Sequence, residues 1–181
     1  MGEMWSEQSH ARPDIKISSG TGQSFAVDGT LLCAWSCVFW TMLTKETWEK
    51  ANGVVKIQGF SDAALDAFIR FMQRCSLPHC GLSWKTVGEL YLLADKYDVK
   101  TLHEACRKQL ISKIDVDVVE DVLALADACS DAELTCAAQK FLSDHWEEME
   151  ASGQLGEMVV DDCFRDVVLR AVSLFRPKPQ A

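Results

Sequence analysis

The stretch from Val87 to Leu110 constrains the fold most, because its apolar residues follow two separate helical repeats. Apolar residues that recur three and four positions apart lie on one face of an α-helix. The register restarts after Asp98, so the spacing predicts two helices joined by a very tight turn. The first face would hold Val87, Leu90, Tyr91, Ala94 and Tyr97, and the second would hold Leu102, Ala105, Cys106 and Leu110.

Short strands and short helices are expected before this hairpin. Runs of apolar and β-branched residues bounded by polar or glycine turns predict strands at residues 14–17, 23–27 and 54–57. The apolar segment from Leu31 to Leu43 is expected to form two short helices that break near Ser36. Ser61 is expected to cap a further helix. The apolar face of that helix would hold Leu65, Phe68, Ile69 and Met72.

Beyond residue 114 the apolar pattern is purely helical. Asp115 is expected to cap the first of these helices, and Ser130 with Glu133 has the spacing of a capping box that opens the next. A last helix is expected to carry Phe164, Val167, Val168, Ala171 and Phe175 on one face. The change of pattern predicts two parts at residues 14–113 and 114–175, between tails at residues 1–13 and 176–181.

The net charge of −9 is unevenly distributed along the 181 residues. Residues 115–162 hold fourteen acidic residues and a single base, Lys140, whereas residues 163–181 hold four bases and one acid. An acidic segment repels phosphate backbones, so a nucleic-acid partner is not expected. The acidic segment has two interpretations, a solvated helical face or a docking surface for a basic partner.

Neither a membrane span nor secretion is expected. The longest apolar runs fall short of the roughly 20 residues that cross a bilayer. The first residues, Met1–Glu7, lack the basic and apolar regions of a secretory signal. The 48% hydrophobic content is typical of a folded globular chain. We therefore expect a protein of the cytoplasm, the nucleus or both.

Most of the eight cysteines lie on expected apolar helical faces, where reduced thiols would act as small buried apolar residues. One alternative is a zinc site built on Cys75, His79 and Cys80, which supply three ligands within six residues. This cluster lacks a second pair with the spacing of a zinc site. No cofactor is expected. The four histidines lie in no motif that would activate a nucleophile, so catalysis is not expected either.

Residues 25–43 and the hairpin together resemble the BTB/POZ family. The segment reads Phe25-x-Val-Asp-Gly-x-Leu-Leu-Cys-Ala-Trp-Ser-Cys-Val-Phe-Trp-x-Met-Leu43, and the string Leu-Leu-Ala-Asp-Lys-Tyr ends at Tyr97. The resemblance implies an α+β, mostly helical fold, in which a small sheet is flanked by helices and followed by an all-helical, BACK-like extension. Residues 115–175 resemble the extension of the speckle-type (MATH-BTB) branch, without its MATH domain.

The resemblance implies a protein–protein interaction module that forms a homodimer and acts as a cullin-3 ubiquitin-ligase adaptor for an unknown client protein. The family's first helix forms the dimer, which points to Leu31 and Trp35, while Leu32 and Phe39 are expected in the core. Two apolar residues in the otherwise polar N-terminal tail could cover the same dimer interface. The residues expected at the dimer interface are therefore Met4, Trp5, Leu31 and Trp35.

The cullin contact implied by the resemblance lies at Thr47, Trp48 and Glu49, with support from Tyr97. The speckle-type branch has a bulky apolar residue where this chain has Thr47. Members of the BTB family usually have His-Lys where this chain has Asp28-Gly29. A threonine methyl is a small anchor, so weak cullin binding is expected, with a gain from Thr47→Met. The alternative is a BTB scaffold that dimerises without binding cullin.

Overall fold

The computed structural model describes residues 14–74 and 81–152. The described residues divide between two compact units. The first unit takes the chain up to Leu82 together with Leu93–Leu102, and the second takes Ser83–Leu92 together with the chain from His103 onward. Helix α5 (Trp84–Lys96) and helix α6 (Lys100–Ile111) therefore each contribute residues to both units.

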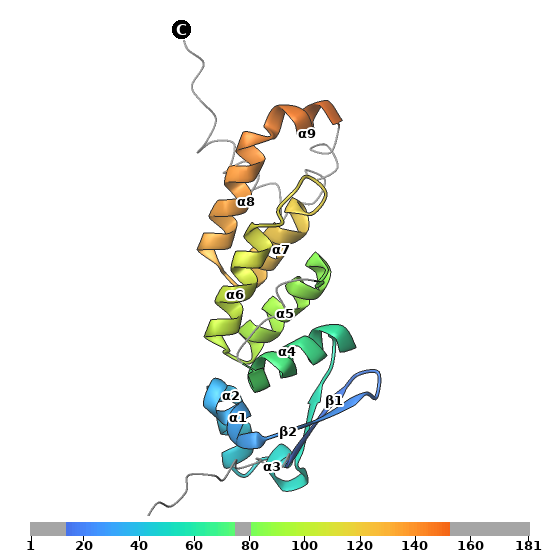
Figure 1. Ribbon diagram of the computed structural model, residues 1–181. Helices are drawn as coiled ribbons and strands as arrows, with labels where there is room; N and C mark the ends of the chain where they lie inside the picture. The colour runs from blue at the N-terminus through green and yellow to red at the C-terminus, as the bar shows by residue number, and fades with distance from the viewer. Residues whose placement is uncertain (1–13, 75–80, 153–181) are drawn as a thin grey trace, which may run out of the picture. The chain divides into compact units, whose positions relative to one another are not determined.

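The first unit contains a three-stranded sheet in the order β2-β1-β3 (Figure 1). Strand β1 pairs antiparallel with β2, and parallel with β3. Alternation along the strands turns Ile17, Val27 and Val55 into the core, where each is fully buried. The three predicted strands are confirmed. Their bounds are β1 Ile15–Ser19, β2 Ser24–Val27 and β3 Val54–Ile57.

Helices α1 (Gly29–Trp35) and α2 (Cys37–Thr44) follow β2, and the chain breaks between them at Ser36, as the sequence predicts. Ser36 is extended, and its hydroxyl accepts the N–H of Phe39 at 3.1 Å and donates to the carbonyl of Tyr97. A serine with a side chain that caps the following helix ends one helix and begins the next. The break therefore follows from one buried hydroxyl.

The structure explains why aspartate and glycine occupy positions 28 and 29. Asp28 caps α1 by accepting the N–H of Thr30 at 2.8 Å, and Gly29 donates its own N–H to the carboxylate of Asp14 at 2.7 Å. A Cβ on Gly29 would lie 2.9 Å from Cγ1 of Ile15, closer than packed carbon atoms come. A larger residue at this position would push α1 away from β1.

Two further helices complete the first unit before the hairpin. Ser61 accepts the N–H of Ala64 at 3.2 Å, which confirms the predicted cap of α4. Leu65, Phe68, Ile69 and Met72 are buried, as expected. The short helix α3 was not expected from the sequence. The bounds are α3 Trp48–Asn52 and α4 Asp62–Arg74.

The predicted hairpin is confirmed as α5 and α6. Asp98 adopts a φ of +50° between the two helices, a left-handed conformation that aspartate tolerates and that makes a short turn. The residues expected on the first face, Val87, Leu90, Tyr91, Ala94 and Tyr97, are all buried. On the second face Leu102, Cys106 and Leu110 are buried, while Ala105 is half-buried.

The described residues after Ile114 form helices only, as predicted, and α7 and α8 lie side by side (Figure 1). Two predicted caps are wrong. Asp115 accepts the N–H groups of Asp117 and Val118 in a turn that precedes α7, so it does not cap the helix itself. The bounds are α7 Val119–Ala128, α8 Ala132–Asp144 and α9 Trp146–Ser152.

The second wrong cap is Ser130. Its φ is +52°, so it ends the turn after α7, and Asp131 caps α8 instead.

Among the described residues, no helix is both long and apolar enough to cross a bilayer. Several predicted features lie outside the described residues: Met4 and Trp5, the Cys75, His79 and Cys80 cluster, and the last helix at residues 164–175.

Candidate protein-interaction surfaces

The three residues Thr47, Trp48 and Glu49 stand together at the start of α3. Thr47 is the N-cap, since its hydroxyl oxygen accepts the N–H of Lys50 at 3.2 Å. The same hydroxyl donates to the carbonyl of Met42. Its polar atom is therefore used within the chain, which leaves only its methyl group for an apolar contact.

Trp48 is the residue of this group that presents apolar surface, with 53% of its area exposed. The ammonium of Lys56 lies 5.2 Å from the centroid of the Trp48 ring. Such a cation over an exposed ring contributes about 0.5–1 kcal/mol, which orients the indole without burying it. Glu49 is half-buried in the first turn of α3, where a carboxylate is favoured by the helix dipole.

Tyr97 lies in the core of the first unit and is 4% exposed. Its ring stacks on Phe39 with centroids 4.6 Å apart, and lies 5.9 Å from Phe68. Burial raises the pKa of its hydroxyl. A side chain in this position supports neighbouring helices through packing and offers little area to a partner.

Helix α1 presents Leu31, which is 37% exposed, while Leu32 and Phe39 are fully buried as expected. Trp35 is half-buried and has contacts of its own: its indole N–H donates to the carbonyl of Met72 at 3.0 Å, and its ring lies 5.4 Å from Phe71. Leu31 is therefore the freer of the two residues expected at a dimer interface.

Trp40 is an exposed apolar residue that the sequence reasoning did not single out. It is 52% exposed on α2 and borders a recess of about 580 Å³ that Cys33, Cys37 and Lys100 also line. A hydrogen bond to the carboxylate of Asp98 raises the pKa of the Cys37 thiol. The sequence does contain a signal for this exposure. Helix α2 has more apolar residues than a single buried face can hold, so some of them must be exposed.

A buried carboxylate organises the second unit. Asp131 accepts the hydroxyl of Tyr91 at 2.8 Å and the Nε–H of Arg107 at 2.6 Å. Its other oxygen accepts the N–H groups of Glu133 and Leu134 at the start of α8. Burial alone would raise the pKa of Asp131, but the hydrogen bonds from Tyr91, Leu134 and Arg107 outweigh it and hold the pKa below its ordinary value. Residues 91, 107 and 131 are thus joined through one side chain.

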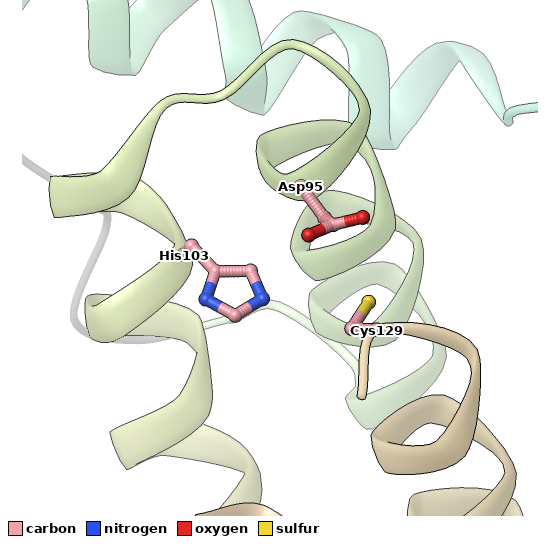
Figure 2. Close-up of side chains that lie close together, drawn as sticks. All are labelled: Asp95, His103 and Cys129. Carbon is pink, nitrogen blue, oxygen red and sulfur yellow. The ribbon is translucent and has the colours of Figure 1, made fainter. Parts of the chain in front are cut away.

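His103 on α6 and Cys129 at the end of α7 both lie near Tyr91. Figure 2 shows the side chains of His103 and Cys129 close together. The His103 ring stacks on Tyr91 with centroids 4.1 Å apart, and the Cys129 thiol contributes to a raised pKa of Tyr91 after burial and the Asp131 hydrogen bond. Asp95, which the same view labels, belongs to the first unit. Histidine and cysteine are metal ligands, but among the described residues of the second unit these two are fewer than a structural zinc site needs.

Comparison with known families matches residues 5–114 to the BTB/POZ domain. This match covers more than half of the chain. The chain belongs to the BTB/POZ family. The BTB domain is a protein–protein interaction module, and as a family it is not enzymatic.

Curated proteins similar to this chain include BTB proteins that carry kelch repeats. Human kelch repeat and BTB domain-containing protein 4 is 28% identical over 137 residues, which are 76% of this chain and 25% of the relative. Human kelch repeat and BTB domain-containing protein 7 is 24% identical over 143 residues, 79% of this chain and 20% of the relative. The chain therefore spans about a fifth to a quarter of the length of these relatives. These relatives are kelch-type, so the likeness to the speckle-type branch is unconfirmed.

Among solved structures, the BTB domain of zebrafish PATZ1 aligns with a TM-score of 0.46 and 15% identity, covering 55% of this chain and 76% of that chain. In the present chain, the small sheet and the helices α1 to α6 fall within the residues that match the family. The exposed residues Leu31, Trp40 and Trp48 lie in the same stretch. The interaction surfaces of the first unit are therefore to be sought on α1, α2 and α3.

Proposed function

We propose that this BTB protein forms a homodimer and acts as an adaptor that joins a client protein to a cullin-3 ubiquitin ligase. The observation that carries the proposal is the exposed Trp48 on α3, at the place where the family resemblance puts the cullin contact. An exposed aromatic residue next to a carboxylate is the kind of anchor on which interfaces depend. The cytoplasm, the nucleus or both would be its location.

A scaffold that dimerises without cullin is the second candidate, and Thr47 favours it. Its hydroxyl holds the start of α3, so the pocket-filling role of a bulky residue is absent from that position. Under either candidate, residues 114–175 form the BACK-like extension. The speckle-type relation and the identity of a client protein belong to the same proposal.

The two candidates differ in one observable. The full chain and the N-terminal domain of cullin-3 are mixed and separated by size-exclusion chromatography with light scattering. Co-elution at the mass of a complex supports the adaptor. Separate elution at concentrations of tens of micromolar, where a dimer is still observed, supports the scaffold.

Trp48→Ala is expected to weaken cullin binding by roughly 10- to 30-fold, because an aromatic anchor at an interface contributes about 2 kcal/mol. Thr47→Met is expected to strengthen it by roughly tenfold, since it adds buried apolar area. The methionine also removes the α3 cap, at about 1 kcal/mol of stability. Calorimetric titration measures both affinities, and urea denaturation measures the cost of the lost cap.

Trp40→Ala is the matched control, because Trp40 is almost equally exposed but lies on α2. Its affinity for cullin should stay close to that of the wild type. Equal losses in Trp40→Ala and Trp48→Ala would mean that the contact is not localised to α3. Equal affinities of Thr47→Met and the wild type would mean that position 47 is not the anchor.

Leu31→Asp is expected to convert the dimer into a folded monomer. Leu31 is the exposed apolar residue of α1, and a carboxylate buried against a second copy would be strongly unfavourable. Light scattering measures the mass, and circular dichroism checks that the helices remain. Trp35→Ala is a poorer test, because it also removes the hydrogen bond to Met72 and the contact with Phe71.

Ala63→Asp adds the same charge at an exposed position of α4 and serves as the control. The control should remain dimeric. A wild-type chain that is already monomeric at tens of micromolar concentration would remove the basis for the interface, as would a Leu31→Asp variant that keeps the mass of the dimer.

A further inference from the structure

The second unit has an open groove between α5 and α7. The groove encloses about 500 Å³, within the range of clefts that hold a ligand or several side chains. Its apolar lining comes from α5 on one side and α7 on the other. These residues are Trp84, Gly88, Leu92, Ala124, Leu125 and Ala128.

Small residues leave this groove unfilled. Gly88 is buried, and a Cβ there would lie 2.9 Å from Cδ1 of Leu125, so α5 and α7 are in close contact at this point of the groove. Ala124 and Ala128 are exposed and too short to cover the apolar floor. Within residues 14–74 and 81–152 the groove therefore leaves apolar area uncovered, and covering that area is favourable.

Both walls of the groove also carry a carboxylate, Glu89 on α5 and Asp121 on α7, and Lys85 of α5 is the one base among the lining residues. The surroundings are strongly acidic: residues 115–152 contain eleven carboxylates and one base, Lys140. An occupant with an apolar face and a base on each margin of that face would complement this arrangement.

Residues 164–176, which lie outside the described residues, have this pattern. On a helix that turns about 100° per residue, Phe164, Val168, Ala171 and Phe175 share one face. Arg165 and Arg176 then lie on one margin of that face and Arg170 on the other. The eleven residues from 153 to 163 can span about 36 Å, which exceeds the length of roughly 20 Å that α8 covers.

We propose that residues 164–176 occupy the groove between α5 and α7 as an amphipathic helix, with arginines on both margins facing Glu89 and Asp121. The inference goes beyond the adaptor function and does not depend on it, because neither cullin nor a second copy takes part. It also gives the acidic second unit a partner within the same chain. A basic, apolar-faced segment of another protein would have to displace this helix to bind there.

Hydrogen exchange of the full chain, read by mass spectrometry, tests the proposal. Amides of residues 164–176 should exchange at least tenfold more slowly than an unstructured peptide. Ala124→Arg fills the groove and adds a base, and should accelerate exchange in this segment at least tenfold. Ala132→Arg makes the same substitution at an exposed position of α8 outside the groove and should change nothing. Unchanged exchange in α5, α7 and α8 would show that the variants are folded.

Charge reversal provides a second test that leaves the groove helices intact. Arg165→Glu with Arg170→Glu should release the segment, and adding Glu89→Lys with Asp121→Lys should restore its protection. The proposal fails if the wild-type segment exchanges as an unstructured peptide, or if Ala124→Arg leaves it protected. Protection that rises with protein concentration would also overturn it, because the occupant would then come from a second copy.

Discussion

Asp131→Ala is expected to lower the free energy of unfolding of the second unit by about 3 kcal/mol. The carboxylate caps α8, and losing an N-cap costs about 1 kcal/mol. The fully buried Tyr91 would also lose the acceptor of its hydroxyl, and an unsatisfied buried polar group costs about 1–3 kcal/mol. Arg107 keeps its contact with Glu133, so the loss of its bond to Asp131 contributes less to the change in unfolding free energy.

Urea denaturation followed by circular dichroism measures this loss. Asp127→Ala is the control, because Asp127 is an exposed acid of the neighbouring α7, and it should stay within about 0.5 kcal/mol of the wild type. Tyr91→Phe removes one hydrogen bond and leaves the cap, so it should cost about 1 kcal/mol. Equal stabilities of Asp131→Ala and Asp127→Ala would show that the carboxylate does not join these helices.

The same carboxylate makes the unfolding free energy depend on pH. The pKa of Asp131 lies below its ordinary value of 3.8 in the folded chain. The stabilisation is therefore fully present above about pH 3.8, and is lost as pH falls through the lower folded pKa. The difference in stability between the wild type and Asp131→Asn should narrow over that acid range and stay constant above it.

Periodicity predicts those parts of the fold in which burial alone decides the structure. The faces of α5 and α4 were correct because a buried stripe must repeat every three to four residues. The break at Ser36 was also correct, since a capping serine interrupts an apolar run. These features depend on neighbours within one or two helical turns, which are visible in the sequence.

The errors arise where a choice between adjacent residues depends on distant contacts. Ser130 and Asp131 both suit a helix cap, and the selection of Asp131 follows from Tyr91 and Arg107, which lie 40 and 24 residues away. Helix α3 has only five residues, too few for a periodic pattern. The exposure of Trp40 likewise depends on which face of α2 meets the core.

Tyr97 is a residue of the candidate site whose role also depends on contacts that are distant in sequence. The resemblance assigned it to the cullin contact, and sequence position alone does not reveal that its ring stacks on Phe39 in the core. Tyr97→Ala is expected to lower the free energy of unfolding of the first unit by about 3–5 kcal/mol, as large aromatic truncations in cores do. Denaturation of this variant measures the packing role alone, because a destabilised unit confounds any test of binding.

Tyr97→Phe separates packing from contact. Phenylalanine keeps the stacked ring, so stability should stay within about 1 kcal/mol of the wild type. If Tyr97 supports the cullin surface through its ring, this variant should bind cullin-3 as tightly as the wild type does. A weaker affinity at unchanged stability would mean that the hydroxyl itself reaches the partner. A side chain that is 4% exposed would then have to be uncovered on binding.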